Sequence, residues 1–380
     1  MLSLLAALSL SGCNGDAPSV SFISDSHVLV QGVDVTNQDC RTGICQHNEN
    51  TDLTTYKGAI YLVHRTAISQ ILGPNSALHV YKTTDGGAHF VEQAILPAPL
   101  NDAIAGKSGR DLRDPHFFEV NGTLYIKALT RLPVTSLRDS FVDTIAVTSS
   151  STDGSHWTPL KAVGPVGWSL WRIQSHAGVL YSAAYADGDA SVALFSSVDG
   201  VTWTRGADVY TVSADTPLET ELTFMPSGRL LALVRMDGTD SEILGDERLR
   251  TKVCWAMPPY DKFDCPQDLD GQRLDGPLSI PWNGRLFNVA RKHFRGDNRK
   301  RTALFEITGN LDGGPLGIKE WGELPSAGDT SYAGAAALDA NRFLVTWYSG
   351  ELAADEQWVF GMLHATDIRQ ATIDLSKLTQ

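Results

Sequence analysis

Short hydrophobic runs rich in Val, Leu, Ile, Tyr and Phe recur along the chain after residue 20, and Gly, Asn and Asp residues separate them. None of the runs keeps an apolar face at helical spacing for long. Runs of this composition are typical of strands, and the residues between them are typical of tight turns. The pattern therefore predicts an all-β chain.

Six of these runs share one hairpin signal, in which a turn residue is followed directly by a hydrophobic strand. The turn residues are Gly58, Gly122, Gly178, Gly228, Gly284 and Asn341. Successive turn residues lie 64, 56, 50, 56 and 57 positions apart. A nearly constant period with several strands in each unit is typical of radial β-sheet repetition. We therefore predict a six-bladed β-propeller of four-stranded antiparallel blades over residues 47–380.

A second motif recurs in TTDGGAHF (83–90), STDGSHW (151–157) and SVDGVTW (197–203). Each segment places a hydroxyl, an Asp, a Gly and a terminal aromatic residue at nearly fixed offsets. The carboxylate accepts backbone N–H groups of a turn, Gly takes the left-handed position, and the ring packs between neighbouring sheets. These segments resemble the Asp-box of the sialidase, or neuraminidase, superfamily. The resemblance implies that they are structural turns on the face opposite the catalytic centre.

The N-terminal segment has the features of an export signal. The apolar stretch 2–10 is too short to span a bilayer, and it ends in LSGC (10–13). This tetrapeptide resembles the bacterial lipobox, which implies a signal peptide over 1–13 and a lipid anchor on Cys13. An ordinary signal peptide with a chance cysteine is the alternative, and both imply export. Residues 14–46 are then expected to form a tether that can also supply a strand closing the ring with the C-terminal ATIDLSKL.

Charge and cysteine content narrow the possible partners and ligands. The chain has 31 Lys and Arg residues against 44 Asp and Glu residues, a formal charge of −13, so a nucleic-acid partner is not expected. Four cysteines follow Cys13, an even number suited to an oxidising compartment. Their short spacings favour Cys40–Cys45 and Cys254–Cys265 disulfides over a metal site, because no His follows at zinc-like spacing. We predict neither a metal nor a cofactor.

The predicted propeller places a set of polar residues at one mouth of the ring. If the first strand of each blade is innermost and runs towards its hairpin, the second strand returns to the face where the first began. Residues seven positions after the turn are Arg65, Leu129, Tyr185, Arg235, Arg291 and Tyr348, and those nine positions before it are Glu49, Arg113, Ser169, Glu219, Asp275 and Tyr332. The concentration of polar and aromatic side chains predicts a rim that faces a ligand. For any single residue, a structural ion pair is the alternative.

The chemistry of this rim suits an anionic ligand. Arg65, Arg235 and Arg291 come from the first, fourth and fifth blades, so three guanidinium groups can converge on one carboxylate in bidentate geometry. Glu219 and Tyr332 occupy equivalent offsets in the fourth and sixth blades. We therefore expect these two side chains to meet across the axis.

The rim residues also resemble the sialidase active site. ETEL around Glu219 with Arg235 sixteen residues later, and DTSYAG around Tyr332, are similar to the segments that carry the catalytic Glu, the second arginine and the tyrosine nucleophile of that family. Arg291 is similar to its third arginine. The resemblance implies that Glu219 takes the proton of Tyr332, whose phenolate attacks the anomeric carbon of a sugar acid.

Two family features are absent at their usual places. The strand that supplies the first sialidase arginine corresponds here to HNENTDL from His47, and Arg65 matches an arginine one strand later. No Asp follows Arg65 where the family keeps its acid/base. The candidate replacements are Asp111 and Asp114 in RDLRDPHF, although Asp114 can instead form a salt bridge with Arg110 or Arg113.

Three further residues are candidates for contact with a sugar. His47 is a possible ligand-binding residue or acid, or a structural histidine. Trp171 and Arg172, in WSLWRIQ, can form a wall on which a sugar stacks. A core Trp beside a surface Arg is the alternative interpretation of this pair.

These observations predict an exported exo-acting glycosidase that acts on a terminal acidic sugar of a glycan or glycoconjugate. The first arginine of the family is missing, which argues against sialic acid itself. A uronic acid or another acidic sugar fits the same charge logic. A polysaccharide lyase would use a comparable set of Tyr, His and Arg residues. A binding propeller without catalytic activity is the third possibility.

Overall fold

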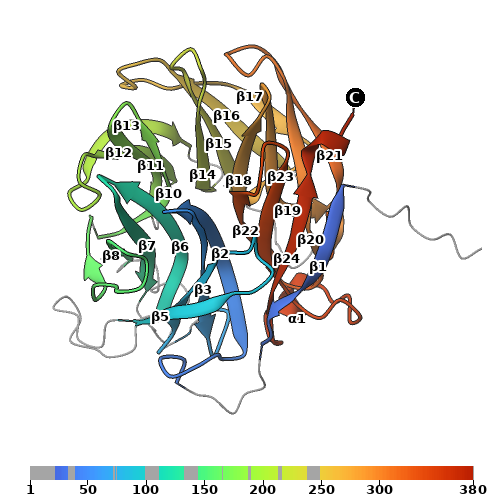
Figure 1. The fold of residues 1–380 in the computed structure, drawn as a ribbon. Coiled ribbons are helices and arrows are strands. Elements are labelled where there is room, and N and C mark those ends of the chain that lie inside the picture. The colour runs from blue at the N-terminus through green and yellow to red at the C-terminus, as the bar shows by residue number, and fades with distance from the viewer. Residues whose placement is uncertain are drawn as a thin grey trace, which may run out of the picture.

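The computed structural model describes residues 22–32, 39–71, 73, 75–98, 111–131, 144–164, 166–186, 190–212, 216–237 and 249–379. The segment with Cys13 and the residue Arg110 lie outside these ranges. Within them the chain forms six four-stranded antiparallel sheets arranged around an axis (Figure 1). The predicted six-bladed, all-β propeller is therefore confirmed.

The strands follow one another blade by blade along the chain. The first blade contains β2 (His47–Tyr56), β3 (Ala59–Ala67), β4 (Ala77–Thr83) and β5 (Val91–Pro97). The second contains β6 (Asp111–Val120), β7 (Thr123–Arg131), β8 (Ile145–Ser151) and β9 (Lys161–Ala162). The third contains β10 (Trp168–His176), β11 (Val179–Ala186), β12 (Ser191–Ser197) and β13 (Thr204–Thr211). The other three contain β14 (Thr216–Phe224), β15 (Leu230–Asp237), β16 (Arg250–Ala256) and β17 (Asp264–Asp270); β18 (Asp275–Trp282), β19 (Arg285–Phe294), β20 (Asp297–Gly309) and β21 (Leu316–Leu324); and β22 (Thr330–Ala337), β23 (Arg342–Ser349), β24 (Asp367–Asp374) and β1 (Ile23–Val30).

The first strand of each blade lines the axis. Strands β2, β6, β10, β14, β18 and β22 each contact the next in this order, and β22 contacts β2, so the six first strands form a closed ring (Figure 1). Each sheet is then built outward in sequence order. This arrangement brings residues from distant parts of the chain to the same height around one axis.

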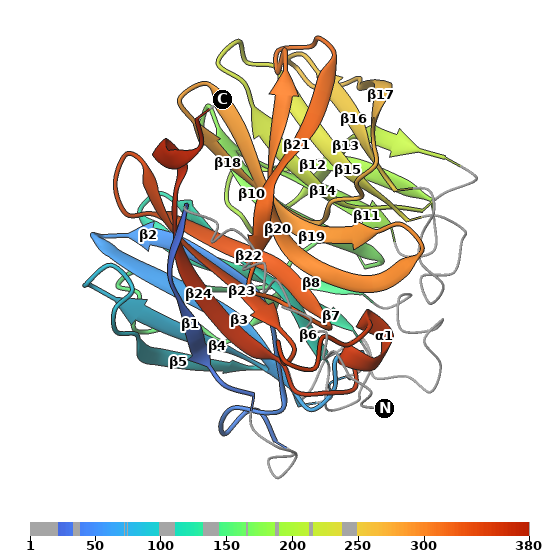
Figure 2. The same ribbon diagram turned by 90° about the vertical axis from the view of Figure 1, so that its right-hand side faces the viewer.

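The N-terminal strand completes the sixth blade. β1 pairs antiparallel with β24, with Ile23 opposite Ile373 and Val30 opposite Ile368 (Figure 2). The two ends of the described chain therefore share one sheet. β1 is the outermost strand of the sixth blade, so the pairing joins the beginning of the propeller to its end within one sheet.

The hydrophobic core is divided among the interfaces between blades. Leu62 and Leu344 pack between the first and sixth blades, and Phe287 packs with Trp347 between the fifth and sixth. The other four interfaces have clusters of the same kind. Because each sheet buries both faces against its neighbours, the ring is stabilised by apolar burial around its whole circumference.

Tight turns of two kinds lie at the hairpin face of the propeller. In the hairpins between first and second strands, residue pairs such as Asn121–Gly122 and Asn283–Gly284 have positive φ, as two-residue type I′ turns require. The three Asp-Gly segments join third and fourth strands. Asp153 Oδ1 accepts the backbone N–H groups of Ser155 and His156, both at 2.8 Å, and Trp157 packs in the core between the first two blades.

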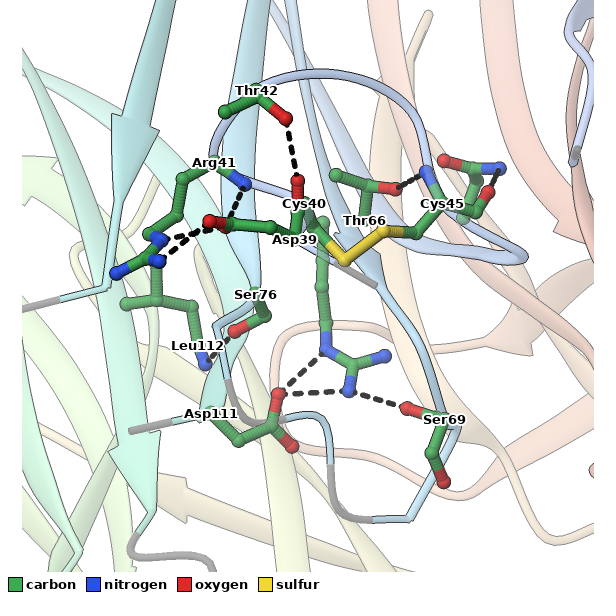
Figure 3. Close-up of a disulfide and its surroundings, with 12 residues drawn as sticks. Asp39, Cys40, Arg41, Thr42, Cys45, Thr66, Ser69, Ser76, Asp111 and Leu112 are labelled. Carbon is green, nitrogen blue, oxygen red and sulfur yellow. Dashed lines mark hydrogen bonds and ion pairs between the residues drawn. A yellow bond between two sulfur atoms is a disulfide. The ribbon is translucent and has the colours of Figure 1, made fainter. Parts of the chain in front are cut away.

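Both predicted disulfides are present, Cys40–Cys45 and Cys254–Cys265. Figure 3 shows the first of them beside Thr66 and Asp111, where the backbone N–H of Cys45 donates to Thr66 Oγ1 at 2.8 Å. The short helix α1 (Trp358–Gly361) and a 3-10 turn at Leu375–Lys377 are the helical segments of the described chain. No helix in the described ranges is long and apolar enough to cross a membrane.

Candidate active site

A β-bulge interrupts the first strand of every blade at the same height. Two residues of the first strand oppose a single residue of the second, and these pairs are Asn50–Thr51, Asp114–Pro115, Trp171–Arg172, Leu218–Glu219, Gly276–Pro277 and Tyr332–Ala333. Four of the bulges begin with a residue at positive φ: Asn50, Asp114, Gly276 and Tyr332. Bulges redirect side chains and occur preferentially beside active sites. Here a ring of six bulges surrounds the axis on the mouth side of the hairpins.

The predicted rim positions lie next to these bulges. Glu49 opposes Arg65 and Asp275 opposes Arg291 in their ladders, as expected for first and second strands that meet at one mouth. Glu219 and Tyr332 fall within the bulges themselves. A single extra residue in each first strand therefore turns these two side chains out of the regular alternation.

Tyr332, Glu219 and Arg235 form a hydrogen-bonded triad. The Tyr332 phenol donates to Glu219 Oε1 at 2.6 Å, and Arg235 Nη1 donates to Glu219 Oε2 at 2.8 Å and to the phenol oxygen at 3.1 Å. Glu219 and Arg235 are buried, and Tyr332 is partly exposed. The side chains predicted to meet across the axis are thus in direct contact.

The protonation state of this triad follows from its burial and charge. Burial raises the pKa of Tyr332 well above its usual range, and the carboxylate charge of Glu219 raises it further, against the opposing charges of Arg235 and Arg291. At neutral pH the phenol is therefore protonated and donates to Glu219. A proton that leaves Tyr332 has a carboxylate oxygen at hydrogen-bond distance to receive it.

Gly276 forms the floor beneath this pair. Its backbone N–H donates to Glu219 Oε2 at 3.0 Å, and a Cβ on Gly276 would lie 2.8 Å from Cγ of the Tyr332 ring. Its φ of +57° is also a conformation that side chains disfavour. A glycine here lets the backbone approach the Glu219 carboxylate and leaves room for the Tyr332 ring.

Three arginines gather around one buried carboxylate, that of Asp275. Arg273 binds it through Nε and Nη2 at 2.8 and 2.9 Å, Arg235 Nε lies 3.2 Å from Oδ1, and Arg291 Nη1 lies 3.7 Å from Oδ2. His293 Nε2 adds a contact at 2.9 Å. Burial alone would raise the pKa of Asp275, but the charges of Arg235 and Arg273 and the contact with His293 hold this pKa well below its usual range. The residues that cluster with Arg235 and Arg291 thus include Arg273, which the repeat spacing did not select.

Arg291 packs against the catalytic tyrosine candidate. Its guanidinium carbon lies 5.1 Å from the centre of the Tyr332 ring. Its Nη2 donates to Asp329 Oδ1 at 3.0 Å and to the Tyr348 hydroxyl at 2.8 Å. Trp358 of α1 also donates to Asp329 Oδ1, at 2.9 Å. The loop between β23 and β24 therefore contributes an aromatic side chain to the site.

Arg65 belongs to a second ion-pair group. Its Nη1 donates to Glu49 Oε2 at 2.8 Å and its Nη2 to Asp111 Oδ1 at 2.8 Å, and Arg113 Nε binds the other oxygen of Asp111 at 2.9 Å. All of these residues come from the first two blades. Within the described chain, the contacts of Arg65 are with this group and with carbonyls of the loop after β3, and not with Arg235 or Arg291.

Asp111 and Asp114 differ in a way that separates the two acid candidates. Asp111 is fully buried between Arg65 and Arg113. Asp114 sits in the bulge, where Asn50 Nδ2 donates to its Oδ1 at 2.6 Å. Burial, and then the charge of Glu219, raise the pKa of Asp114. Arg113 pairs with Asp111 rather than with Asp114, and the other salt-bridge partner considered for Asp114, Arg110, lies outside the described residues.

Trp171 and Arg172 do not form a wall open to a sugar in this conformation. Trp171 is 0% exposed, because its ring packs in the core beside His116 and Tyr332. Arg172 is a buried residue rather than a surface one. Its Nη1 donates to Asp52 at 2.8 Å, and its other nitrogens donate to main-chain carbonyls of the fifth and sixth blades.

The remaining candidates are buried at the edge of the site. His47 begins β2, and its Nδ1 lies 3.5 Å from Glu49. Tyr185 packs in the core between the third and fourth blades. Tyr348 donates to Asp329 Oδ1 at 3.0 Å while it accepts from Arg291. Tyr348 is thereby linked to Tyr332 through Arg291, which donates to the Tyr348 hydroxyl and packs over the Tyr332 ring.

Solved structures share this architecture, whereas no protein-family model and no curated protein matches the sequence. The NanB sialidase from Streptococcus pneumoniae aligns with a TM-score of 0.65 at 10% identity over 94% of this chain and 71% of that chain. The intramolecular trans-sialidase from Ruminococcus gnavus aligns with a TM-score of 0.63 at 12% identity over 93% of this chain and 100% of that chain. The chain has the sialidase fold. An α-L-arabinanase from Penicillium chrysogenum aligns with a TM-score of 0.61 at 12% identity over 94% of this chain and 99% of that chain. Because proteins of different activity share this architecture, the likeness establishes the fold, and the chemistry must be argued from the site residues.

Several site residues were not predicted from the sequence. Arg273 lies outside the two offsets that the repeat defines, and so does Asp237, which accepts hydrogen bonds from Arg235 Nε and Nη2. Trp358 comes from a loop that the repeat does not describe. Gly276 and Asp329 had a signal. Gly276 directly follows the rim position Asp275, and Asp329 begins the DTSYAG segment on which the sialidase resemblance depends.

Proposed function

We propose that the protein is an exported glycosidase of sialidase type that removes a terminal acidic sugar, with Tyr332 as nucleophile and Glu219 as its base. The observation that carries this proposal is the contact of the phenol with Glu219 at 2.6 Å, with Arg235 hydrogen-bonded to both side chains. A nucleophile held against a base that a third group orients is the general arrangement of covalent catalysis. The sialidase fold adds a propeller mouth at which such a group can meet a chain end.

The reaction follows from the proton positions. Glu219 accepts the phenol proton as the oxygen of Tyr332 attacks the anomeric carbon, and the bond to the leaving sugar breaks. Asp114 gives a proton to the leaving oxygen, so a neutral alcohol departs and a glycosyl-tyrosine remains. Water then attacks that carbon and gives one proton to Asp114, the bond between the carbon and the Tyr332 oxygen breaks, and Glu219 returns the first proton to the released Tyr332 oxygen. Both residues end in their starting states.

The neighbours of Tyr332 suit this sequence of charges. Arg235 Nη1 already donates to the phenol oxygen, so it can stabilise the phenolate as it forms. A neutral tyrosine also avoids the repulsion that a carboxylate nucleophile would exert on an anionic sugar. Arg235 and Arg291 flank the tyrosine and are the cations that the sugar carboxylate would meet.

Asp114 has the environment that a leaving-group acid needs. Burial, and then the charge of Glu219, raise the pKa of Asp114 and so favour its protonated form. Glu219 accepts hydrogen bonds from Tyr332, Arg235 and Gly276, which hold the proton acceptor of the first step against the phenol.

A turnover screen tests the proposal. Fluorogenic sialosides and uronides are incubated with the wild-type chain, with Tyr332→Phe and with Glu219→Gln, and we expect both variants to lose about 10² to 10⁴-fold in kcat/KM. Tyr56→Phe is the matched control, because the Tyr56 hydroxyl binds carbonyls at the hairpin face. Turnover that survives Tyr332→Phe refutes the mechanism. A rise in ultraviolet absorbance from an unsaturated product would identify a lyase, and saturable binding without product would identify a binding propeller.

We also propose that the chain works outside the cytoplasm, anchored by a lipid on Cys13. Two disulfides support an oxidising compartment. The expected result is that the full chain incorporates labelled fatty acid and sediments with membranes, whereas Cys13→Ala does neither. Fatty-acid labelling that persists in Cys13→Ala would contradict this proposal.

A further inference from the structure

The fork of Arg235 is occupied by a carboxylate of the protein itself. Arg235 Nε donates to Asp237 Oδ1 at 2.7 Å and its Nη2 donates to Asp237 Oδ2 at 2.9 Å. Two parallel N–H to oxygen bonds of this kind are the geometry in which an arginine binds the carboxylate of a ligand. Arg273 Nη1 lies 3.3 Å from the same Asp237.

Asp237 and Asp275 each contact both Arg235 and Arg273, and Asp237 is the more exposed of these two acids. Its side chain is 20% exposed, whereas that of Asp275 is 0% exposed. Asp275 therefore belongs to the buried framework, and Asp237 lies nearer to solvent. Asp237 is also the last residue of β15, where it pairs with Thr216 at the end of the ladder. Rotation of its side chain leaves the ladder intact.

Among the described residues, the carboxylates in contact with these arginines outnumber the arginines themselves. Arg235, Arg273 and Arg291 are in contact with four carboxylates, those of Glu219, Asp237, Asp275 and Asp329. A further carboxylate brought to this group would be repelled. If the Asp237 carboxylate leaves the fork as the ligand enters, the local charge does not change and the same two hydrogen bonds form again.

We propose that Asp237 is a specificity-determining residue, a resident competitor that a sugar carboxylate must displace from the fork of Arg235. The proposal rests on the proposed function, because it takes an acidic sugar as the ligand. Its consequence is selective. Asp237 weakens the binding of acidic sugars and does not affect that of otherwise identical neutral sugars, so the preference of the wild type for acidic sugars is smaller than the arginines alone would give.

Calorimetric binding to the full chain tests this. The probes are N-acetylneuraminic acid and glucuronic acid, each with its methyl ester as the neutral counterpart. For Asp237→Asn we expect about tenfold or more tighter binding of the acids and unchanged binding of the esters. The control is Asp208→Asn, which removes an exposed partner of Arg205. Unchanged, weaker or undetectable binding of both acids to Asp237→Asn overturns the proposal, and so does equal tightening for the esters.

A second readout needs no sugar. Asp237→Ala leaves a space of carboxylate size at the fork, so acetate is expected to raise the melting temperature of this variant and not that of the wild type. Acetamide, which has the same shape without the charge, should have no effect. An equal response to acetate in both proteins contradicts the proposal. Neither measurement involves turnover, so failure of the Tyr332 mechanism and failure of the Asp237 proposal are distinguishable.

Discussion

The hydroxyl of Tyr332 lies 2.6 Å from a carboxylate oxygen of Glu219, although 113 positions separate the two residues in the chain. The contact depends on two bulges in different blades, since both residues stand in the extra positions of their first strands. Ring closure sets the distance across the axis, and the bulges set the direction of the side chains. The pair is therefore a product of the whole ring rather than of one local segment.

Gly276→Ala should strongly reduce turnover while it lowers the free energy of unfolding only modestly. The new Cβ would lie 2.8 Å from the Tyr332 ring, so the ring must move away from Glu219. The positive φ adds about 1 kcal/mol of backbone strain. We expect a loss of about 10²-fold or more in kcat/KM, comparable to loss of the base. Circular dichroism melts and fluorogenic assays measure the two effects.

Gly284→Ala is the matched control for this variant. Gly284 has a φ of +75°, and a Cβ at this position would meet nothing within 4 Å, so it shares the strain without the clash. The substitution should cost similar stability and leave turnover unchanged. Equal losses of turnover in both variants would show that backbone strain, and not contact with Tyr332, is responsible.

Asp114→Asn should lower kcat/KM most for substrates whose leaving group is most basic. An acid is needed when the leaving oxygen is an alkoxide and is hardly needed for an activated phenol, so about 10²-fold or more is lost on a natural linkage and little on an aryl glycoside. Because burial and the charge of Glu219 raise the pKa of Asp114, the wild type should stay active to higher pH than an ordinary Asp would allow. Activity then falls as pH rises through that pKa, and Asp114→Asn should lack this alkaline limb. Equal losses on both substrates would exclude Asp114 as the acid.

The sequence predicted the arrangement of the blades better than it predicted the side-chain contacts at the axis. The six turn residues and their spacing define the blades, because each turn needs a residue that tolerates its backbone geometry. The pairing of Glu219 with Tyr332 was also predicted, because their equivalent offsets place both residues at the same mouth of the ring. Spacing carries no information on rotamers, however. It grouped Arg65 with Arg235 and Arg291, whereas the side chain of Arg65 turns to Glu49 and Asp111.

The bulges explain much of what the sequence did not predict. A bulge adds one residue and reverses the alternation of faces beyond it, so the faces assigned to Trp171 and Arg172 could not be derived from a count of positions. Arg273 and Trp358 come from segments outside the repeat. Their positions depend on Asp275 and Asp329, which are recognisable as anchors after the blades are assembled.

Glu221→Gln should remove a component of the pH dependence of stability. Glu221 is buried on the axis, where its Oε2 lies 3.8 Å from Arg172, and burial raises its pKa to about 7. A carboxyl group whose pKa is higher in the folded state stabilises the protein at low pH, and this contribution is lost as pH rises from about 4.5 through 7. Denaturation by urea at pH 5 and pH 8 should therefore show a smaller decrease for Glu221→Gln than for the wild type. An identical decrease in both proteins would contradict the prediction.

Arg172→Met should be the most destabilising of these changes. From the third blade, Arg172 binds Asp52 of the first blade and the carbonyls of Pro277 and Ala333 of the fifth and sixth. Its removal leaves a buried carboxylate unpaired, which costs about 3–5 kcal/mol. The measurement is the free energy of unfolding in guanidinium chloride. Arg205→Met is the control, because Arg205 forms an exposed ion pair with Asp208 and such pairs contribute about 0–1 kcal/mol.

The same variant separates an axial role of Arg172 from a role in sugar binding. Because Arg172 is buried and bound to groups of three other blades, the fraction of Arg172→Met that remains folded should bind acidic sugars with affinity close to that of the wild type. Calorimetry at a temperature well below the melting transition measures this affinity. A stable variant with about tenfold weaker binding would instead place Arg172 in contact with the ligand. A loss of stability with retained affinity identifies it as the residue that joins the blades at the axis.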